Sequence, residues 1–124
     1  MHPRKILVVD NEAQILEHLS RLLTASGWRV TTAINGKDAL EKVKTSRPDA
    51  IVLDMIMPEM DGFQVARSLK SDPDYRNIPI VAATSLSSRA DRERCLAAGC
   101  DDYVAKPFTM QQLQHQLKTL LQNS

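Results

Sequence analysis

The sequence lacks any long apolar run and any excess of charge of one sign. No apolar stretch is long enough to span a bilayer, and the four apolar residues before Asp10 are too few for the core of a signal peptide. Sixteen Lys and Arg residues against fifteen Asp and Glu residues leave a net charge of only +1, whereas proteins that follow nucleic-acid phosphates are usually strongly basic. We therefore expect a cytoplasmic protein with no membrane contact and no direct nucleic-acid binding.

Cysteines and glycine-rich phosphate motifs are also scarce. Cys95 and Cys100 fall in a predicted helix and the loop after it, with no His or carboxylate at ligand spacing, so we interpret them as reduced packing residues. The sequence contains neither G-x-x-x-x-G-K-[ST] nor G-x-G-x-x-G, and its first strand-to-helix turn is acidic. Nucleotide and flavin cofactors are therefore not expected, since their phosphates need uncovered backbone amides.

The length of 124 residues, with 43% hydrophobic and 25% charged residues, is typical of one globular domain. We find no linker and no internal repeat, and the last predicted helix runs almost to Ser124. The prediction is a single domain over residues 1–124, with a core from about 5 to 121 and no output domain.

Five strand-length apolar runs divide the chain, at residues 6–9, 28–33, 50–53, 78–83 and 103–105. The first, third and fourth are almost continuously apolar, as in strands buried on both faces of a parallel sheet, whereas the second has the interleaved polar residues of an edge strand. Leucine stripes at helical spacing, over residues 15–23 and 113–121, predict amphipathic helices between and after these strands. The alternation predicts an α/β fold with a doubly wound parallel sheet.

Polar residues stand where four of these strands end. They are Asp10, Asn11 and Glu12 after the first strand, Asp54 after the third, Thr84 and Ser85 after the fourth, and Lys106 after the fifth. Each alone is explained by a helix cap, a turn or a solvated loop charge. Together they indicate one functional site, because ligands of open α/β sheets bind beyond the carboxyl ends of the strands.

The residue types at these ends favour phosphoryl transfer. Oxygens of Asp10, Asn11 and Asp54 suit Mg²⁺, a hard cation that keeps several waters. Lys106 and the Thr84 hydroxyl could hold phosphoryl oxygens while phosphorus transfers in line to a carboxylate. We expect Asp54 to be the nucleophile, because it ends the central strand.

These segments together resemble the receiver domain of two-component response regulators, from Lys5 to about Leu121. Residues 6–12 resemble the acidic-pair motif, 54–62 the phosphoacceptor segment, and 83–85 and 103–108 the switch and lysine segments. The resemblance implies a flavodoxin-like three-layer (βα)5 sandwich with strand order 2-1-3-4-5. It also implies phosphorelay signal transduction, with a phosphoryl group accepted from a histidine kinase or histidine phosphotransfer protein.

The resemblance implies a role for each matching residue. Asp54 would be the phosphoacceptor, and Mg²⁺ would be held by Asp10, Asn11, Asp54 and the backbone carbonyl of Ile56. The chain would not be an enzyme in the usual sense, since it would catalyse only its own phosphorylation and dephosphorylation.

The remaining implied roles concern switching. Lys106 would pair with the phosphoryl group, Thr84 would move to bond it, and Tyr103 would change rotamer as Thr84 moves. The bond between Lys106 and Pro107 would be cis. The output would be a contact with a downstream protein, through the surface of the fourth helix, fifth strand and fifth helix. Whether phosphorylation also makes the chain dimerise is left open.

Two features lead to further hypotheses. Asn11 stands where the family usually has a second acid, so we expect weaker Mg²⁺ binding and slower phosphorylation. Ile56 and Leu86, two positions after the acceptor and the threonine, are apolar, which predicts slow hydrolysis of the phosphorylated state.

Two other functions compete with the leading one. The first is a degenerate receiver that acts as a phosphorylation-independent interaction module; Asn11 favours it, and retention of Asp54, Thr84 and Lys106 weighs against it. The second is a phosphohydrolase with an aspartyl nucleophile. That class would be expected to show Asp-x-Asp and a cap domain, whereas here Ile56 stands two residues after Asp54.

Overall fold

The computed structural model describes residues 4–85 and 88–122, and over these residues five strands alternate with five helices. The strands are β1 (Lys5–Val9), β2 (Arg29–Ala33), β3 (Ala50–Asp54), β4 (Ile80–Thr84) and β5 (Asp102–Ala105). The helices are α1 (Ala13–Ala25), α2 (Gly36–Ser46), α3 (Gly62–Ser71), α4 (Arg89–Ala97) and α5 (Met110–Gln122). No helix in these ranges is both long and apolar enough to cross a bilayer.

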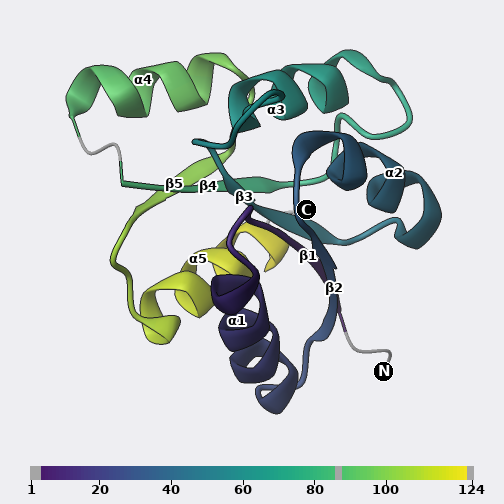
Figure 1. The fold of residues 1–124 in the computed structure, drawn as a ribbon, viewed down its shortest axis with the longest axis vertical. Coiled ribbons are helices and arrows are strands. Elements are labelled where there is room, and N and C mark those ends of the chain that lie inside the picture. Colours follow the sequence, from purple (N-terminus) through teal and green to yellow (C-terminus); the bar gives the residue numbers. More distant parts are fainter. Residues whose placement is uncertain (1–3, 86–87, 123–124) are drawn as a thin grey trace.

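All neighbouring strands pair in parallel, in the order β2-β1-β3-β4-β5. Figure 1 shows three layers, with α2, α3 and α4 over one face of the sheet and α1 and α5 over the other. The predicted fold class and strand order are therefore confirmed. Because β3 lies at the centre of the sheet, its carboxyl end stands between the ends of β1 and β4.

The core consists of two apolar clusters, one on each face of the sheet. Alternate strand residues face opposite sides, so Leu7 and Leu53 join the cluster under α2, α3 and α4, whereas Ile6 and Val52 join the cluster under α1 and α5. The continuous apolar runs follow from this arrangement, since each central strand is covered on both faces.

The boundaries of all five strands differ from the predicted apolar runs, by one residue at β1, β2, β3 and β5 and at both ends of β4. Trp28 is not part of β2, because its N–H donates to the Leu23 carbonyl and closes the end of α1. Strand β4 begins at Ile80, after a proline that has no N–H, and it includes Thr84 as its last residue. The ladder sets this end, since Thr84 pairs with Ala105.

Close approach of the first residue of α3 to the end of β3 explains the glycine at position 62. A Cβ atom at Gly62 would lie 2.6 Å from the Asp54 carbonyl oxygen, and the Gly62 N–H donates to the Met55 carbonyl over 3.1 Å. Asp61 begins α3 with a reciprocal cap, because its carboxylate accepts from the Gln64 N–H and the Gln64 side chain accepts from the Asp61 N–H. This turn sets the start of α3 directly beside Asp54.

Side chains cap backbone groups on both edge strands. On β5, the Tyr103 carbonyl accepts a 2.8 Å hydrogen bond from the Gln116 side chain, and the Tyr103 N–H donates to the Asp102 carboxylate. On β2, the Thr32 carbonyl accepts from the Lys42 ammonium over 2.9 Å. Capped edges resist pairing with a further strand.

The two cysteines are packing residues, as predicted. Both are free and buried, on the face of the sheet covered by α2, α3 and α4. Burial raises the pKa of the Cys100 thiol to about 12, so it stays protonated at neutral pH.

Candidate functional site

Two carboxylates and one ammonium group meet at the carboxyl edge of the sheet. Asp10 follows β1, Asp54 is the last residue of β3, and Lys106 follows β5. The Lys106 Nζ lies 3.0 Å from Asp10 Oδ2 and 3.7 Å from Asp54 Oδ1. Both carboxylates are buried, with Asp10 only 2% and Asp54 only 6% exposed. The structure thus brings together three of the residues predicted from the strand ends.

Backbone hydrogen bonds orient each carboxylate. Asp10 Oδ1 accepts a 2.9 Å hydrogen bond from the Glu12 N–H, and Asp54 Oδ1 accepts a 3.2 Å bond from the Ile56 N–H. In both cases the donor lies two residues further on, in the turn that leaves the strand. The contacts of Asp54 with Ile56 and Lys106 both go to Oδ1, so Oδ2 lies outside these two contacts.

Burial controls the ionisation of Asp54. Desolvation raises the pKa of its carboxyl group above the ordinary 3.8, the charge of Asp10 acts in the same direction, and Lys106 and the Ile56 N–H oppose the rise. A buried carboxylate with a raised pKa is poorly hydrated, which favours its use as a nucleophile or ligand.

Three further predicted residues lie at the same edge. Thr84 is fully buried at the end of β4, next to β3, and its carbonyl accepts from the Lys106 N–H over 2.8 Å. Asn11 is exposed in the turn after β1, and Ile56 is 51% exposed in the turn after β3. The peptide bond between Lys106 and Pro107 is cis, as the resemblance implied. Leu86, the other residue in the hydrolysis hypothesis, lies outside the described residues.

Tyr103 lies on β5, and its ring packs into the buried cluster under α4. Its hydroxyl is buried and has no hydrogen-bond partner among residues 4–85 and 88–122. Burial also raises the pKa of this hydroxyl. The Arg92 guanidinium of α4 lies 5.4 Å from the ring centroid, a cation–π contact. Arg92 falls in a stretch of mixed charge, residues 89–94, that the sequence favours as a solvated helix face, and its contact with Tyr103 is not predictable from that pattern.

A shallow apolar hollow lies beside Lys106, and it was not predicted from the sequence. Its lining residues are Gln14, Ile15, His18, Leu19, Ser85, Lys106, Pro107 and Phe108, around a volume of about 630 Å³. Four of the lining residues could have been grouped from the sequence. Gln14, Ile15, His18 and Leu19 have the spacing i, i+1, i+4, i+5, which places them on one side of α1. Only the fold brings that side of the helix to the segment after β5.

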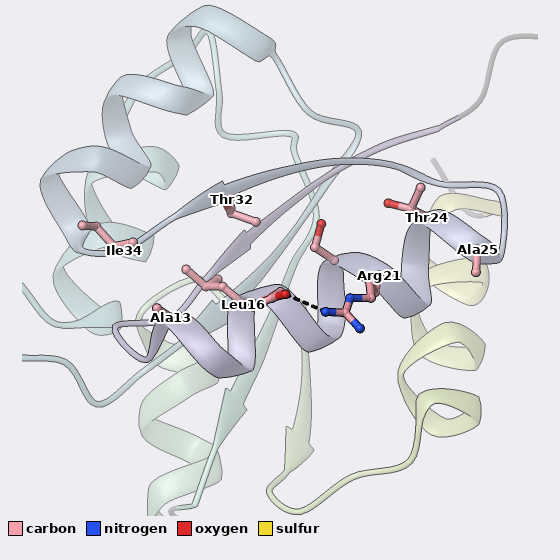
Figure 2. A pocket seen from close by; sticks show the side chains of 9 residues that line it. Ala13, Leu16, Arg21, Thr24, Ala25, Thr32 and Ile34 are labelled. Carbon is pink, nitrogen blue, oxygen red and sulfur yellow. Dashed lines mark hydrogen bonds and ion pairs between the residues drawn. The ribbon is translucent and has the colours of Figure 1, made fainter.

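A second hollow, shown in Figure 2, lies between α1 and β2. Its lining includes Leu16, Thr32 and the ion pair between Glu17 and Arg21, and it shares no residue with the acid and lysine cluster. The two hollows thus lie along different sides of the same helix.

Comparison with known proteins finds matches over nearly the whole chain. The family model described as "Response regulator receiver domain" matches residues 6–118. The chain is 40% identical over 122 residues to "Response regulator MprA" of Mycolicibacterium vanbaalenii, covering 98% of this chain and 52% of that protein. The Mycobacterium ulcerans protein of the same name is 41% identical over 120 residues, covering 97% of this chain and 51% of that protein. The chain therefore spans about half the length of the curated relatives it matches.

Solved structures show the same fold. The chemotaxis protein CheY4 of Vibrio cholerae superposes with a TM-score of 0.90 at 30% identity, covering 95% of this chain and 98% of that one. The signal receiver domain of a signal transduction histidine kinase from Syntrophus aciditrophicus gives a TM-score of 0.89 at 38% identity, covering 97% of this chain and 91% of that one.

Proposed function

The chain belongs to the response regulator receiver domain family, and from this premise we propose that it is a phosphorylation-driven signalling module with Asp54 as its phosphoacceptor. The donor is a histidine kinase or a histidine phosphotransfer protein, and the module works in the cytoplasm. The observation that supports this proposal best is the buried Asp54 carboxylate beside the Lys106 ammonium, 3.7 Å away at the carboxyl edge of a 2-1-3-4-5 sheet.

Phosphoryl transfer requires the protein mainly to position the reacting groups and to neutralise charge on the phosphoryl oxygens. Asp54 attacks phosphorus in line, and the leaving group departs on the far side. Lys106 neutralises charge on the phosphoryl oxygens, after giving up its contact with Asp10. The fully buried Thr84 lies on the neighbouring strand, from which its hydroxyl would turn to the new phosphoryl group. The module catalyses only its own phosphorylation and dephosphorylation.

The side chains at this edge fit a magnesium ion. Carboxylate oxygens of Asp10 and Asp54, the amide oxygen of Asn11 and the backbone carbonyl of Ile56 are all hard oxygen donors. A bound Mg²⁺ supplies positive charge that screens the phosphoryl oxygens from the acids. The donor set carries two carboxylates and a neutral amide, which supports the hypothesis that Asn11 weakens metal binding.

The output surface is formed by α4, β5 and α5. Tyr103 connects this surface to the phosphorylation site, because β5 pairs with β4 and β4 ends in Thr84. Side chains cap the β5 backbone at Tyr103, which favours a protein target that docks through side-chain contacts rather than by adding a strand. Phosphorylation-dependent pairing of two copies through the same surface is a variant of this proposal.

Intact-mass measurement after incubation with acetyl phosphate and Mg²⁺ tests the proposal. The parent chain should gain about 80 Da, the mass of one phosphoryl group, and the Asp54→Asn variant should not. A gain that persists in Asp54→Asn would contradict the assignment of the acceptor. Continuous release of phosphate from a generic phosphate ester would instead support an aspartyl phosphohydrolase.

A further inference from the structure

Helix α4 is held to the rest of the molecule by few buried side chains. Of its nine residues only Cys95 is buried, whereas every other helix buries at least three. Two arginines of α4 add contacts with aromatic rings. The Arg92 guanidinium lies 5.4 Å from the centroid of the Tyr103 ring, and the Arg94 guanidinium lies 4.3 Å from the centroid of the Phe63 ring. One arginine therefore attaches α4 to β5, and the other attaches it to α3.

The two arginines contact opposite flanks of the helix. Side chains two residues apart on an α-helix point about 200° apart, and Cys95 lies between them on the buried side. Loss of either contact would loosen α4, but only the loss of Arg92 would also free the Tyr103 ring. Arg92 and Arg94 thus form a matched pair for separating the two effects.

The Tyr103 ring has space to leave its buried position. It is only 9% exposed and packs in the cluster under α4. A hollow of about 320 Å³ adjoins it, lined by Arg92, Tyr103, Val104, Ala105, Pro107, Gln112 and Gln116. Within residues 4–85 and 88–122, no hydrogen bond fixes the ring's hydroxyl. Apolar packing and the Arg92 contact are therefore what these residues provide to keep the ring buried.

The buried ring lies on the same face of the sheet as the Thr84 side chain. Tyr103 pairs with Ala82 across β4 and β5, and alternation along β4 places Thr84 on the face of Ala82. Tyr103 and Thr84 are therefore diagonal neighbours, a separation that an aromatic side chain can reach. A ring that stays buried occupies space into which Thr84 would otherwise turn away from Asp54. The buried ring thus favours the orientation of Thr84 that a phosphoryl group on Asp54 requires.

We propose that Arg92 is a positioning residue that holds the Tyr103 ring buried and thereby prepares Thr84 for the phosphoryl group. The inference rests on the proposed function of Asp54. Arg92 acts through the ring, from an exposed position on α4. Arg94 makes the same kind of contact with Phe63, so it attaches α4 without acting on Tyr103.

Nitration by tetranitromethane measures how often the Tyr103 ring leaves its buried position. The chain has two tyrosines, so Tyr75 serves as an internal reference. In Arg92→Gln the ratio of the Tyr103 to the Tyr75 nitration rate should rise about twofold to fivefold, as expected for loss of one exposed cation–π contact. Loss of charge alone would act in the opposite direction. Arg92 opposes the rise of the Tyr103 pKa, and nitration proceeds through the phenolate.

Arg94→Gln is the matched control, because it removes the other ring contact of the same helix from a similarly exposed position. It should leave the ratio at the parent value. Arg92→Lys keeps a cation but not the planar guanidinium, so its ratio should lie between those of the parent chain and Arg92→Gln. Equal ratios in the parent chain and Arg92→Gln would overturn the inference. An equal rise in Arg94→Gln would also overturn it, since any loosening of α4 would then expose the ring.

Labelling with acetyl phosphate and Mg²⁺ tests the connection to Asp54. In Arg92→Gln the nitration ratio should fall at least twofold on labelling, because Thr84 turned toward the phosphoryl group leaves the ring its buried position. Adding Asp54→Asn to Arg92→Gln should abolish this fall. A ratio that labelling does not change would overturn the inference, although the mass gain at Asp54 would still support the proposed function.

A parent chain that gains no mass would contradict the proposed function instead. Nitration of the unlabelled variants would still decide whether Arg92 holds the ring, because that comparison needs no phosphoryl group. The two failures are therefore distinguishable.

Discussion

The ammonium group of Lys106 lies 3.0 Å from Oδ2 of Asp10, although 96 residues separate the two in the sequence. The contact joins the segment after β5 to the end of β1, across the ends of β3 and β4. Lys106 therefore compensates the charge of two buried acids in this state and would be available to a phosphoryl group when the contact with Asp10 breaks.

Replacing Lys106 with Met keeps the aliphatic chain and removes the charge. Asp10 and Asp54 are then buried together without compensation. We expect the free energy of unfolding at pH 7 to fall by about 2 kcal/mol, less than for a fully buried pair because Lys106 is partly exposed. Urea denaturation at pH 7 and about pH 3 measures this, and the loss should shrink at the lower pH, where the Asp54 carboxyl group, whose pKa burial raises, is protonated. A loss that is equal at both pH values would show that packing of the side chain, not its charge, is responsible.

Asp54→Asn should stabilise the protein at neutral pH. The pKa of Asp54 is raised by burial in the folded state, so just above the ordinary value of 3.8 the folded chain binds more protons than the unfolded chain. Stability therefore falls as pH rises from that value through the raised pKa. The neutral amide removes this loss, and we expect a gain of about 1 kcal/mol at pH 7 that disappears near pH 3. Thermal denaturation over this range checks the prediction, and a gain independent of pH would contradict it.

Asn11→Asp should strengthen magnesium binding. A third carboxylate raises the negative charge of the donor set, and we expect an affinity about tenfold higher, because ligand charge is a main determinant of affinity for such cations. Calorimetric titration of the unphosphorylated protein with Mg²⁺ measures this without relying on phosphorylation. The rate of labelling by acetyl phosphate should rise as well. Unchanged affinity and rate would exclude Asn11 from the metal site.

Ile56→Asn should shorten the lifetime of the phosphorylated protein. Ile56 is half exposed in the turn that contacts Asp54, where its apolar side chain would hinder an attacking water. Loss of the mass gain over time should become roughly threefold to tenfold faster. Ile34→Asn is the matched control, since Ile34 is a similarly exposed isoleucine that follows β2. Equal lifetimes for both variants and the parent chain would contradict this role of Ile56.

Sequence by itself determined the secondary structure and the identity of the strand-end residues. Leucines at helical spacing predicted α1 and α5, and Asp61 begins α3 with a cap that is complete within four residues. These features are local, so their periodicity and capping chemistry can be recognised without knowing the fold. The boundaries at Trp28 and Thr84 were less accurate, because a helix-closing hydrogen bond and a strand ladder set them.

The tertiary structure decided which residues meet and in what environment. Strand order places Asp54 between Asp10 and Lys106, and burial by the surrounding layers raises the Asp54 pKa. The hollow beside Lys106 and the contact of Arg92 with Tyr103 likewise join helices to strand segments far along the chain. Spacing in a sequence reports which face of its own helix or strand a side chain occupies. It carries no information on which other element covers that face. In this protein the covering elements set the charge and shape of the site.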